Sequence, residues 1–382
     1  MTNDALLVFE DGTHARGRSI GATGTAFGEV VFNTSMTGYQ EVLTDPSYRG
    51  QIVTMTTAHV GNYGMNDADQ ESDLMQVSGF VVREAARQPS SWRAQRDLRG
   101  ELAAAGIVAI EGVDTRAITR HVREQGAMRA AISTEILDAD ALVADAAASP
   151  MMEGAELASE VTTAEPYVVE AIAEMRHRVV VLDFGMKRSI ARDLARCGAQ
   201  VHVLPSSSDA DDVLACEPDG VLLSNGPGDP AAVRDGIATT QALLGRVPVF
   251  GICLGSQLLG HALGARTYKL RFGHHGVNQP VQRRLDGAVE ITSHNHGFAV
   301  DPETFGETTG PFTYNTADFG SVEVSHVNLN DGVCEGVVAS DVRAFSVQYH
   351  PEAAPGPSDA SYLFDRFAAV MSGDISAISE GR

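Results

Sequence analysis

The chain has 382 residues, of which 43% are hydrophobic and 20% charged, a composition typical of globular proteins that bury sizeable cores. No apolar run approaches the ~20 residues that span a bilayer, and the first residues lack the basic and then apolar pattern of a secretory signal. The net charge of −22 argues against a nucleic-acid partner, because binding phosphates requires clustered Lys and Arg. We therefore expect a cytoplasmic protein of two domains, with neither nucleic acid nor membrane as a partner.

Residues 1–137 are predicted to form the smaller domain, of the α+β class. Short β-rich runs alternate there with Gly, Asp and Asn turns, which is typical of several short strands. Two helical patterns follow, and Asp114 or Thr115 is suited to cap the second of them. The charged positions of that second helix are interpreted as a solvated face rather than a binding site.

Residues 138–176 are rich in Ala, Asp, Glu and Ser, and we interpret them as a helical linker. From there the pattern changes, because short apolar strands and helices alternate through 177–382. This alternation predicts an α/β domain with a doubly wound, mostly parallel sheet. In such sheets, ligands bind at the carboxyl ends of the strands.

Cys253 lies where an apolar strand at 247–252 passes into a predicted helix. A thiol at a helix N-terminus meets unpaired backbone N–H groups, which favour the nucleophilic thiolate. The flanking Gly251 and Gly255 allow the close backbone approach that a nucleophile turn requires. The alternative is a buried core cysteine, but the bracketing glycines favour a nucleophile.

His350 is the candidate acid and base for this cysteine. It follows the apolar strand AFSVQY, and it reaches the same sheet edge as Cys253 if the two strands are neighbours. Pro351 ends the strand ladder, so Glu352 is able to fold back and orient the imidazole. On the residues alone, a structural role for His350 is an equal alternative.

The segment Ser224–Pro230, SNGPGDP, is a second candidate element of the site. Gly226 and Gly228 permit backbone conformations that direct N–H groups toward one point, as an oxyanion hole requires. The N–H of Leu254 is the natural second donor. An ordinary turn remains the alternative for this segment.

Two histidine groups, His274-His275 and His294-Asn295-His296, raise the question of a metal. Neither group has a Cys or carboxylate partner at ligand spacing, and the cysteines lack paired spacing, so we expect no metal site. Asn295, Gly297 and Phe298 are suited instead to holding a small polar ligand. The sequence also lacks a phosphate-binding loop, so any ATP chemistry must belong to another chain.

The segments around Cys253, Ser224–Pro230 and His350 together resemble the three signatures of class I, triad-type glutamine amidotransferases. Other segments, among them FNTSMTGYQEVLTDPSY, VDTRAITRHVREQGA and FGHHGVNQPV, resemble the family of small, glutamine-hydrolysing subunits of carbamoyl-phosphate synthetase. The resemblance covers nearly the whole chain. One departure is Ser256, where the family often has His.

The resemblance implies Cys253 as nucleophile, His350 as acid and base, and Glu352 as its orienting group. It further implies that glutamine is held by Ser47, Gly226, Gly228, Leu254, Gln257, Asn295, Gly297 and Phe298. Of these, Ser47 would come from the other domain.

The resemblance also implies a partner, a large subunit that joins this chain in a heterodimer or a higher oligomer. That subunit would use ATP and Mg to make carbamoyl phosphate from bicarbonate and the ammonia released here, for arginine and pyrimidine synthesis. The small subunit itself would need no cofactor. Two alternatives are a stand-alone thiol amidohydrolase of the same fold and a non-catalytic regulatory scaffold.

Overall fold

The computed structural model describes residues 4–379, which fall into two compact units. Residues 4–155 together with Arg271–Gly276 form the first unit, and residues 156–270 and 277–379 form the second. The chain therefore has the two-domain organisation that its length and composition predict.

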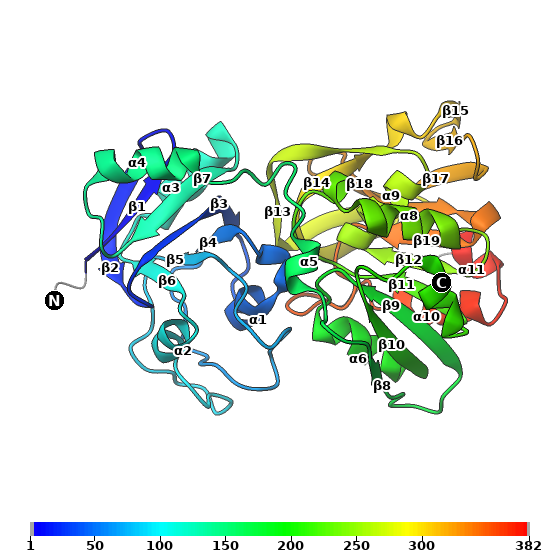
Figure 1. Ribbon diagram of the computed structural model, residues 1–382, viewed down its shortest axis with the longest axis horizontal. Coiled ribbons are helices and arrows are strands. Elements are labelled where there is room, and N and C mark those ends of the chain that lie inside the picture. Colours follow the sequence, from blue (N-terminus) through cyan, green and yellow to red (C-terminus); the bar gives the residue numbers. More distant parts are fainter. Residues whose placement is uncertain (1–3, 380–382) are drawn as a thin grey trace. The chain divides into compact units, whose positions relative to one another are not determined.

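The first unit is a closed barrel with strand order β1-β2-β6-β5-β4-β3-β7 (Figure 1). The pairs β3–β4, β4–β5 and β5–β6 are parallel, and the other pairs are antiparallel. Its elements are β1 (Asp4–Phe9), β2 (His14–Ser19), β3 (Thr25–Asn33), α1 (Tyr39–Thr44), η1 (Pro46–Tyr48), β4 (Gln51–Met55), β5 (Gly79–Val82), α2 (Leu98–Ala104), β6 (Val108–Glu111), α3 (Thr115–Gln125), β7 (Met128–Ser133) and α4 (Ala139–Ala148).

The predicted cap of α3 is present in this unit. Asp114 precedes the helix, and its side chain accepts a hydrogen bond from the N–H of Ala117. The arginines of α3 at 116, 120 and 123 are exposed, as the interpretation of a solvated face requires. Ile118 and Val122 on the opposite face enter the barrel core.

The segment 138–176, interpreted above as a linker, is divided between the two units. Leu142 and Ala146 of α4 are fully buried against Leu6 and Val8 of β1, so residues 138–155 belong to the first unit. The rest belongs to the second unit and includes β8 (Tyr167–Val169), a strand paired with β10. The apolar face of α4 is the physical reason why its part of the segment packs on the barrel rather than standing apart.

The second unit is built on a sheet of order β14-β13-β17-β18-β19-β12-β11-β9-β10-β8, with β15 and β16 attached beside β17. Strands β19, β12, β11, β9 and β10 run parallel. The elements not yet given are α5 (Ala158–Val161), β9 (His177–Asp183), α6 (Arg188–Arg196), β10 (Ala199–Pro205), α7 (Ala210–Ala215), β11 (Gly220–Leu223), η2 (Pro230–Ala232), α8 (Arg234–Leu243), β12 (Val249–Ile252), α9 (Leu254–Ala262), β13 (Arg266–Arg283), β14 (Val289–Asp301), η3 (Pro302–Thr304), β15 (Glu307–Gly310), β16 (Thr313–Asn315), β17 (Ser321–Asn328), β18 (Cys334–Ala339), η4 (Ser340–Val342), β19 (Ala344–Val347), α10 (Tyr362–Met371) and α11 (Ser376–Ser379).

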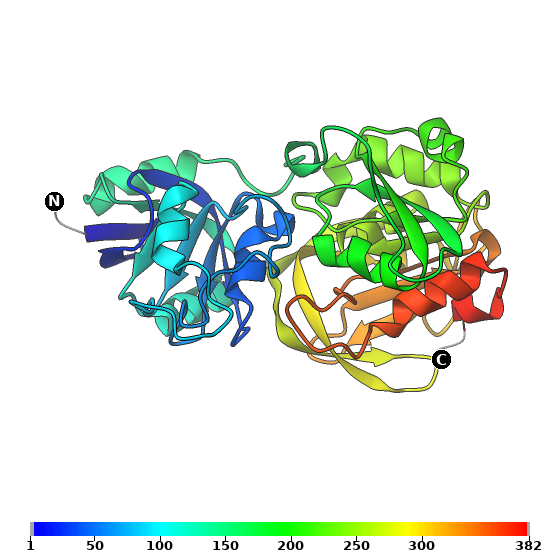
Figure 2. The same ribbon diagram turned by 90° about the horizontal axis from the view of Figure 1, so that it is seen from below.

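Successive residues of the central strands enter two different cores. Val249 of β12 packs with α8 and α9 on one face, whereas Phe250 packs with α6 and α10 on the other. Figure 2 shows the red helix α10 and the light-green helices α8 and α9 on opposite sides of the sheet. Strands covered on both faces explain why these segments are continuously apolar, and the doubly wound prediction is confirmed.

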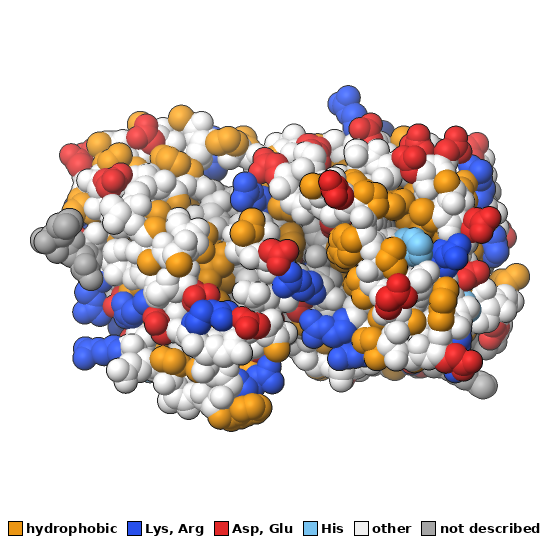
Figure 3. Space-filling view, turned by 60° about the horizontal axis from the view of Figure 1, so that its bottom comes forward, with side chains coloured by type: hydrophobic (Ala, Val, Ile, Leu, Met, Phe, Trp, Pro, Cys, Tyr) orange, Lys and Arg blue, Asp and Glu red, His pale blue; other side chains and the backbone are white. Residues whose placement is uncertain are grey.

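Within residues 4–379, no helix combines the length and apolar character that crossing a bilayer would demand. On the face drawn in Figure 3, acidic and basic side chains are interspersed.

Candidate active site

Cys253 occupies a strained turn between β12 and α9. Its backbone has φ 55° and ψ −105°, in the positive-φ half of the conformational map, which non-glycine residues rarely enter. A Cβ atom at Gly251 would lie 2.5 Å from the carbonyl oxygen of Gly255, and one at Gly255 would lie 2.1 Å from that of Leu223. Both glycines are therefore required for the tight passage from strand to helix that presents the thiol.

The neighbouring strand delivers His350 to the same end of the sheet. Strands β12 and β19 are parallel partners, with Ile252 opposite Val347, and the N–H of Cys253 donates to the carbonyl oxygen of Val347 at 3.0 Å. Three residues further on, the N–H of His350 donates to the carbonyl oxygen of Ser293 at 2.8 Å. The role predicted for His350 requires that β12 and β19 be neighbouring strands, and they are.

Glu352 orients His350, and Lys187 in turn pairs with Glu352. The sequence analysis does not single out Lys187. Nδ1 of His350 lies 2.6 Å from Oε1 of Glu352, and Nζ of Lys187 lies 2.9 Å from the same oxygen. All three side chains are almost completely buried. Because Nδ1 donates to the carboxylate, Nε2 is the ring nitrogen left for chemistry.

Burial and charge act in opposite directions on this pair. Burial alone lowers the pKa of His350, but the negative charges of Glu352 and Cys253 raise it to about 10. Burial alone raises the pKa of Glu352, but the positive charges of Lys187 and His350 lower it to about 2. At neutral pH the imidazole of His350 is therefore cationic.

Lys187 is positioned by the loop between β9 and α6. Oδ1 of Asp183 accepts the N–H groups of Gly185 and Met186, and Oδ1 of Asn225 accepts the N–H of Lys187 at 3.1 Å. Asn225 belongs to the predicted oxyanion segment, so that segment and the lysine are tied together. A buried lysine needs such a partner as Glu352, since an unpaired buried ammonium is strongly destabilising.

The predicted glutamine contacts on α9 and β14 lie close to the thiol. Sγ of Cys253 lies 3.5 Å from the carbonyl oxygen of Asn295. Nε2 of Gln257 donates to the carbonyl oxygen of Phe298 at 2.7 Å and to Oε1 of Gln348 at 3.1 Å. The amide of Gln348 in turn lies 3.8 Å from Sγ of Cys253, so these residues form one connected cluster.

The glycine segment packs against the start of α9. A Cβ atom at Gly226 would meet the side chain of Leu254 at 2.8 Å, and Gly228 has φ 94°. Leu254 itself is the first residue of α9, where the helix provides no acceptor for the N–H. By contrast, a Cβ atom at Gly297 would have no neighbour within 4 Å, so this glycine borders open space.

Ser47 and Ser256, both named in the sequence analysis, make hydrogen bonds within their own units. Ser47 is a buried residue of η1 in the first unit, where its N–H donates to Oδ1 of Asp45 at 2.9 Å. Ser256, the departure from the family pattern, forms a hydrogen bond of 2.8 Å with the hydroxyl of Ser346 on β19. Ser256 thus joins α9 to β19, the strand that precedes His350.

Comparison with known proteins identifies the relatives of this chain. Residues 7–132 match the family described as "Carbamoyl-phosphate synthase small chain, CPSase domain", and residues 180–370 match "Glutamine amidotransferase class-I". A carbamoyl phosphate synthase small chain of Streptomyces coelicolor is 54% identical over 97% of this chain and 96% of its own length. One of Thermotoga maritima is 51% identical over 97% of this chain and 99% of its own.

The two matched families divide the chain as its two units do, with the barrel in one and the parallel sheet carrying Cys253 in the other. The expected resemblance is confirmed over nearly the full length. The chain belongs to the carbamoyl-phosphate synthase small chain family, and its second domain is a class-I glutamine amidotransferase.

Proposed function

We propose that this chain hydrolyses the side-chain amide of glutamine at Cys253 and passes the ammonia to a large synthase chain. The observation that carries the proposal is the strained Cys253 turn on β12, next to the strand that delivers the His350–Glu352 pair. A nucleophile, a proton carrier and an orienting carboxylate are the parts that cysteine-dependent amide hydrolysis requires.

In the first half of the reaction, the Cys253 thiolate attacks the amide carbon and forms the S–C bond. The N–H groups of Leu254 and of the Gly226–Gly228 segment stabilise the oxyanion. The C–N bond then breaks as Nε2 of His350 gives its proton to the leaving nitrogen, so ammonia departs and a γ-glutamyl thioester remains. Glu352 keeps the proton of Nδ1 in place throughout.

In the second half, His350 is neutral and takes a proton from water, and the resulting hydroxide attacks the thioester. The S–C bond breaks to give glutamate and regenerate the Cys253 thiolate, while His350 regains its charge. Lys187 keeps Glu352 ionised through both halves. Gln257, Asn295, Gly297 and Phe298 hold the substrate, and for Ser47 that role rests on the family resemblance alone.

The partner of this chain follows from what it lacks. Its relatives are small chains by name, and no phosphate-binding loop occurs in the sequence. We therefore assign the ATP and Mg chemistry, and the use of bicarbonate, to a large chain. No cofactor is assigned to this one.

The test compares two nitrogen sources in the assembled enzyme. With the large chain present, Cys253→Ser should abolish carbamoyl phosphate synthesis from glutamine while leaving synthesis from added ammonia intact. Cys216→Ser, at the half-buried end of α7, is the control and should change neither activity. Glutamine-dependent synthesis that survives in Cys253→Ser would overturn the assignment of the nucleophile.

A further inference from the structure

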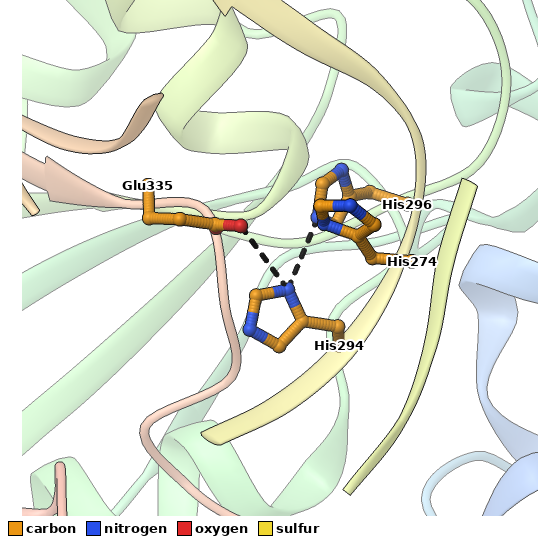
Figure 4. Close-up of side chains that lie close together, drawn as sticks. All are labelled: His274, His294, His296 and Glu335. Carbon is orange, nitrogen blue, oxygen red and sulfur yellow. Dashed lines mark hydrogen bonds and ion pairs between the residues drawn. The ribbon is translucent and has the colours of Figure 1, made fainter. Parts of the chain in front are cut away.

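Three buried side chains of the second unit meet between β14 and β18 (Figure 4). Nδ1 of His294 lies 3.1 Å from Nε2 of His296 and 3.7 Å from Oε1 of Glu335. The side chains of His294 and Glu335 are completely buried, and His296 is 5% exposed. His274, which Figure 4 also labels, belongs to the segment assigned to the first unit and is left outside this site.

Hydrogen bonds fix the proton of His296. Its Nδ1 lies 2.8 Å from the carbonyl oxygen of Phe298, and a carbonyl oxygen only accepts. Nδ1 therefore carries the hydrogen. In the neutral imidazole, Nε2 then presents a lone pair toward His294.

Hydrogen bonds also determine which ring nitrogen of His294 carries the hydrogen. The hydroxyl of Thr292 donates its single hydrogen to the carbonyl oxygen of Gln279 at 3.0 Å. Its oxygen, 2.7 Å from Nε2 of His294, must then accept, so Nε2 carries the hydrogen. The neutral ring presents the Nδ1 lone pair toward His296.

Two neutral rings held in this way would bring two lone pairs face to face at 3.1 Å, beside a carboxylate oxygen. Such a contact is repulsive unless a positive charge lies between the three atoms. Because all three side chains are almost completely buried, such a charge would be bound within the site. The candidates are a proton and a metal ion.

The geometry points to a structural divalent metal site of the zinc class, formed by His294, His296 and Glu335. Two nitrogen ligands at ~2.0–2.1 Å from a tetrahedral zinc lie roughly 3.3 Å apart, and the observed separations of 3.1 and 3.7 Å lie on either side of that value. Two imidazoles with one carboxylate form a donor set that zinc accepts.

The residues behind these ligands complete the arrangement. Metal-binding imidazoles usually donate their second N–H to an oxygen, as His294 does to Thr292 and His296 does to Phe298. The amide of Asn328 donates to Oε1 of Glu335 at 2.9 Å and orients the carboxylate. With so little exposure, the ion would enter as the domain folds.

The site would also fix the strand beside the nucleophile. Asn295, whose carbonyl oxygen lies 3.5 Å from Sγ of Cys253, lies between the two histidines on β14. The carbonyl oxygen of Phe298 accepts from both His296 and Gln257. An ion at His294 and His296 would therefore hold β14 in register for the glutamine contacts, as a structural element rather than a catalytic one.

The test is metal analysis of the full chain, produced without a polyhistidine tag and dialysed against a weak chelator. We expect one zinc per chain in the wild type and in His202→Gln, a control on β10. We expect loss of that zinc in both His294→Gln and Glu335→Gln. Wild-type chain stripped of metal and refolded with zinc should melt about 5 °C higher than chain refolded without zinc, with no such difference in either site variant.

Two results would overturn the metal site. One is a wild-type chain without bound metal whose melting temperature does not respond to zinc; the positive charge would then be a proton shared by the histidines. The other is equal zinc content in the wild type and in both site variants. The melting curve of each variant shows whether it folded, so loss of metal is distinguishable from loss of the domain.

Discussion

Nζ of Lys187 lies 2.9 Å from Oε1 of Glu352, and the two residues are 165 positions apart in the chain. The same carboxylate oxygen orients the imidazole of His350. Lys187 is thus a positioning residue, because it acts on the proton carrier through Glu352. It keeps the carboxylate ionised in a site where burial alone would protonate it.

Lys187→Met should move the acidic limb of the glutaminase pH profile to higher pH. Without the ammonium charge, the pKa of Glu352 rises from about 2 toward its ordinary value, so the carboxylate protonates earlier as pH falls. The pH dependence of kcat/KM measures this shift. Arg246→Met, at an exposed site after α8, is the control and should leave the pH profile unchanged. An unshifted pH profile in Lys187→Met would contradict the role of the lysine.

Glu352→Gln should destabilise the protein in a pH-dependent way. Because the folded pKa of Glu352 is depressed, its stabilising contribution is complete above about pH 4.5 and is lost as pH falls toward 2. At neutral pH the variant leaves Lys187 without its counter-charge, at a cost of about 3–5 kcal/mol.

The measurement for Glu352→Gln is denaturant unfolding at several pH values, with the exposed Glu307→Gln as the matched control. The difference in unfolding free energy between the wild type and Glu352→Gln should shrink as the pH falls from 4.5 toward 2. A difference that stays constant over that range would show that the charge of Glu352 is not what stabilises the site.

Gly297→Ala should weaken glutamine binding without affecting the fold. A methyl group at this position meets no atom within 4 Å and needs no unusual backbone angle, so the free protein should accept it. If glutamine occupies the open space, KM should rise at least about tenfold with little change in melting temperature. Gly310→Ala in β15, where a methyl group also fits, should leave KM unchanged.

Gly255→Ala should disrupt the nucleophile turn. Its methyl group would overlap the carbonyl oxygen of Leu223, a backbone atom that is unable to move aside without distorting β11. We expect a loss of about 1–3 kcal/mol or more in unfolding free energy, together with the loss of glutaminase activity. A stable variant of normal activity would mean that the passage from β12 to α9 is less tight than described.

The features that could be predicted from the sequence are local ones. The glycines around Cys253 lie within two residues of it, and the apolar runs of the doubly wound domain carry their pattern in consecutive positions. The His-Pro-Glu run likewise brings Glu352 back to His350 over two residues. In each case the residues that interact are close together in the sequence.

The features that could not be predicted depend on contacts between distant strands. Lys187 lies 165 positions before Glu352 in the chain, and only the packed sheet brings the two together. Similarly, the histidines at 294 and 296 lack a nearby carboxylate in the sequence, and Glu335 reaches them from another strand. The composition of segment 138–176 likewise does not reveal that α4 packs on the barrel.

The central claim is that the sulfur of Cys253 becomes covalently attached to the γ-carbonyl of glutamine. The most direct measurement is an acid quench of the full chain during turnover of radiolabelled glutamine, followed by peptide mapping. We predict label on the peptide that contains Cys253, released by hydroxylamine as a thioester is, and absent from Cys253→Ser. Turnover with no label on that peptide, or with label on another residue, would contradict the account.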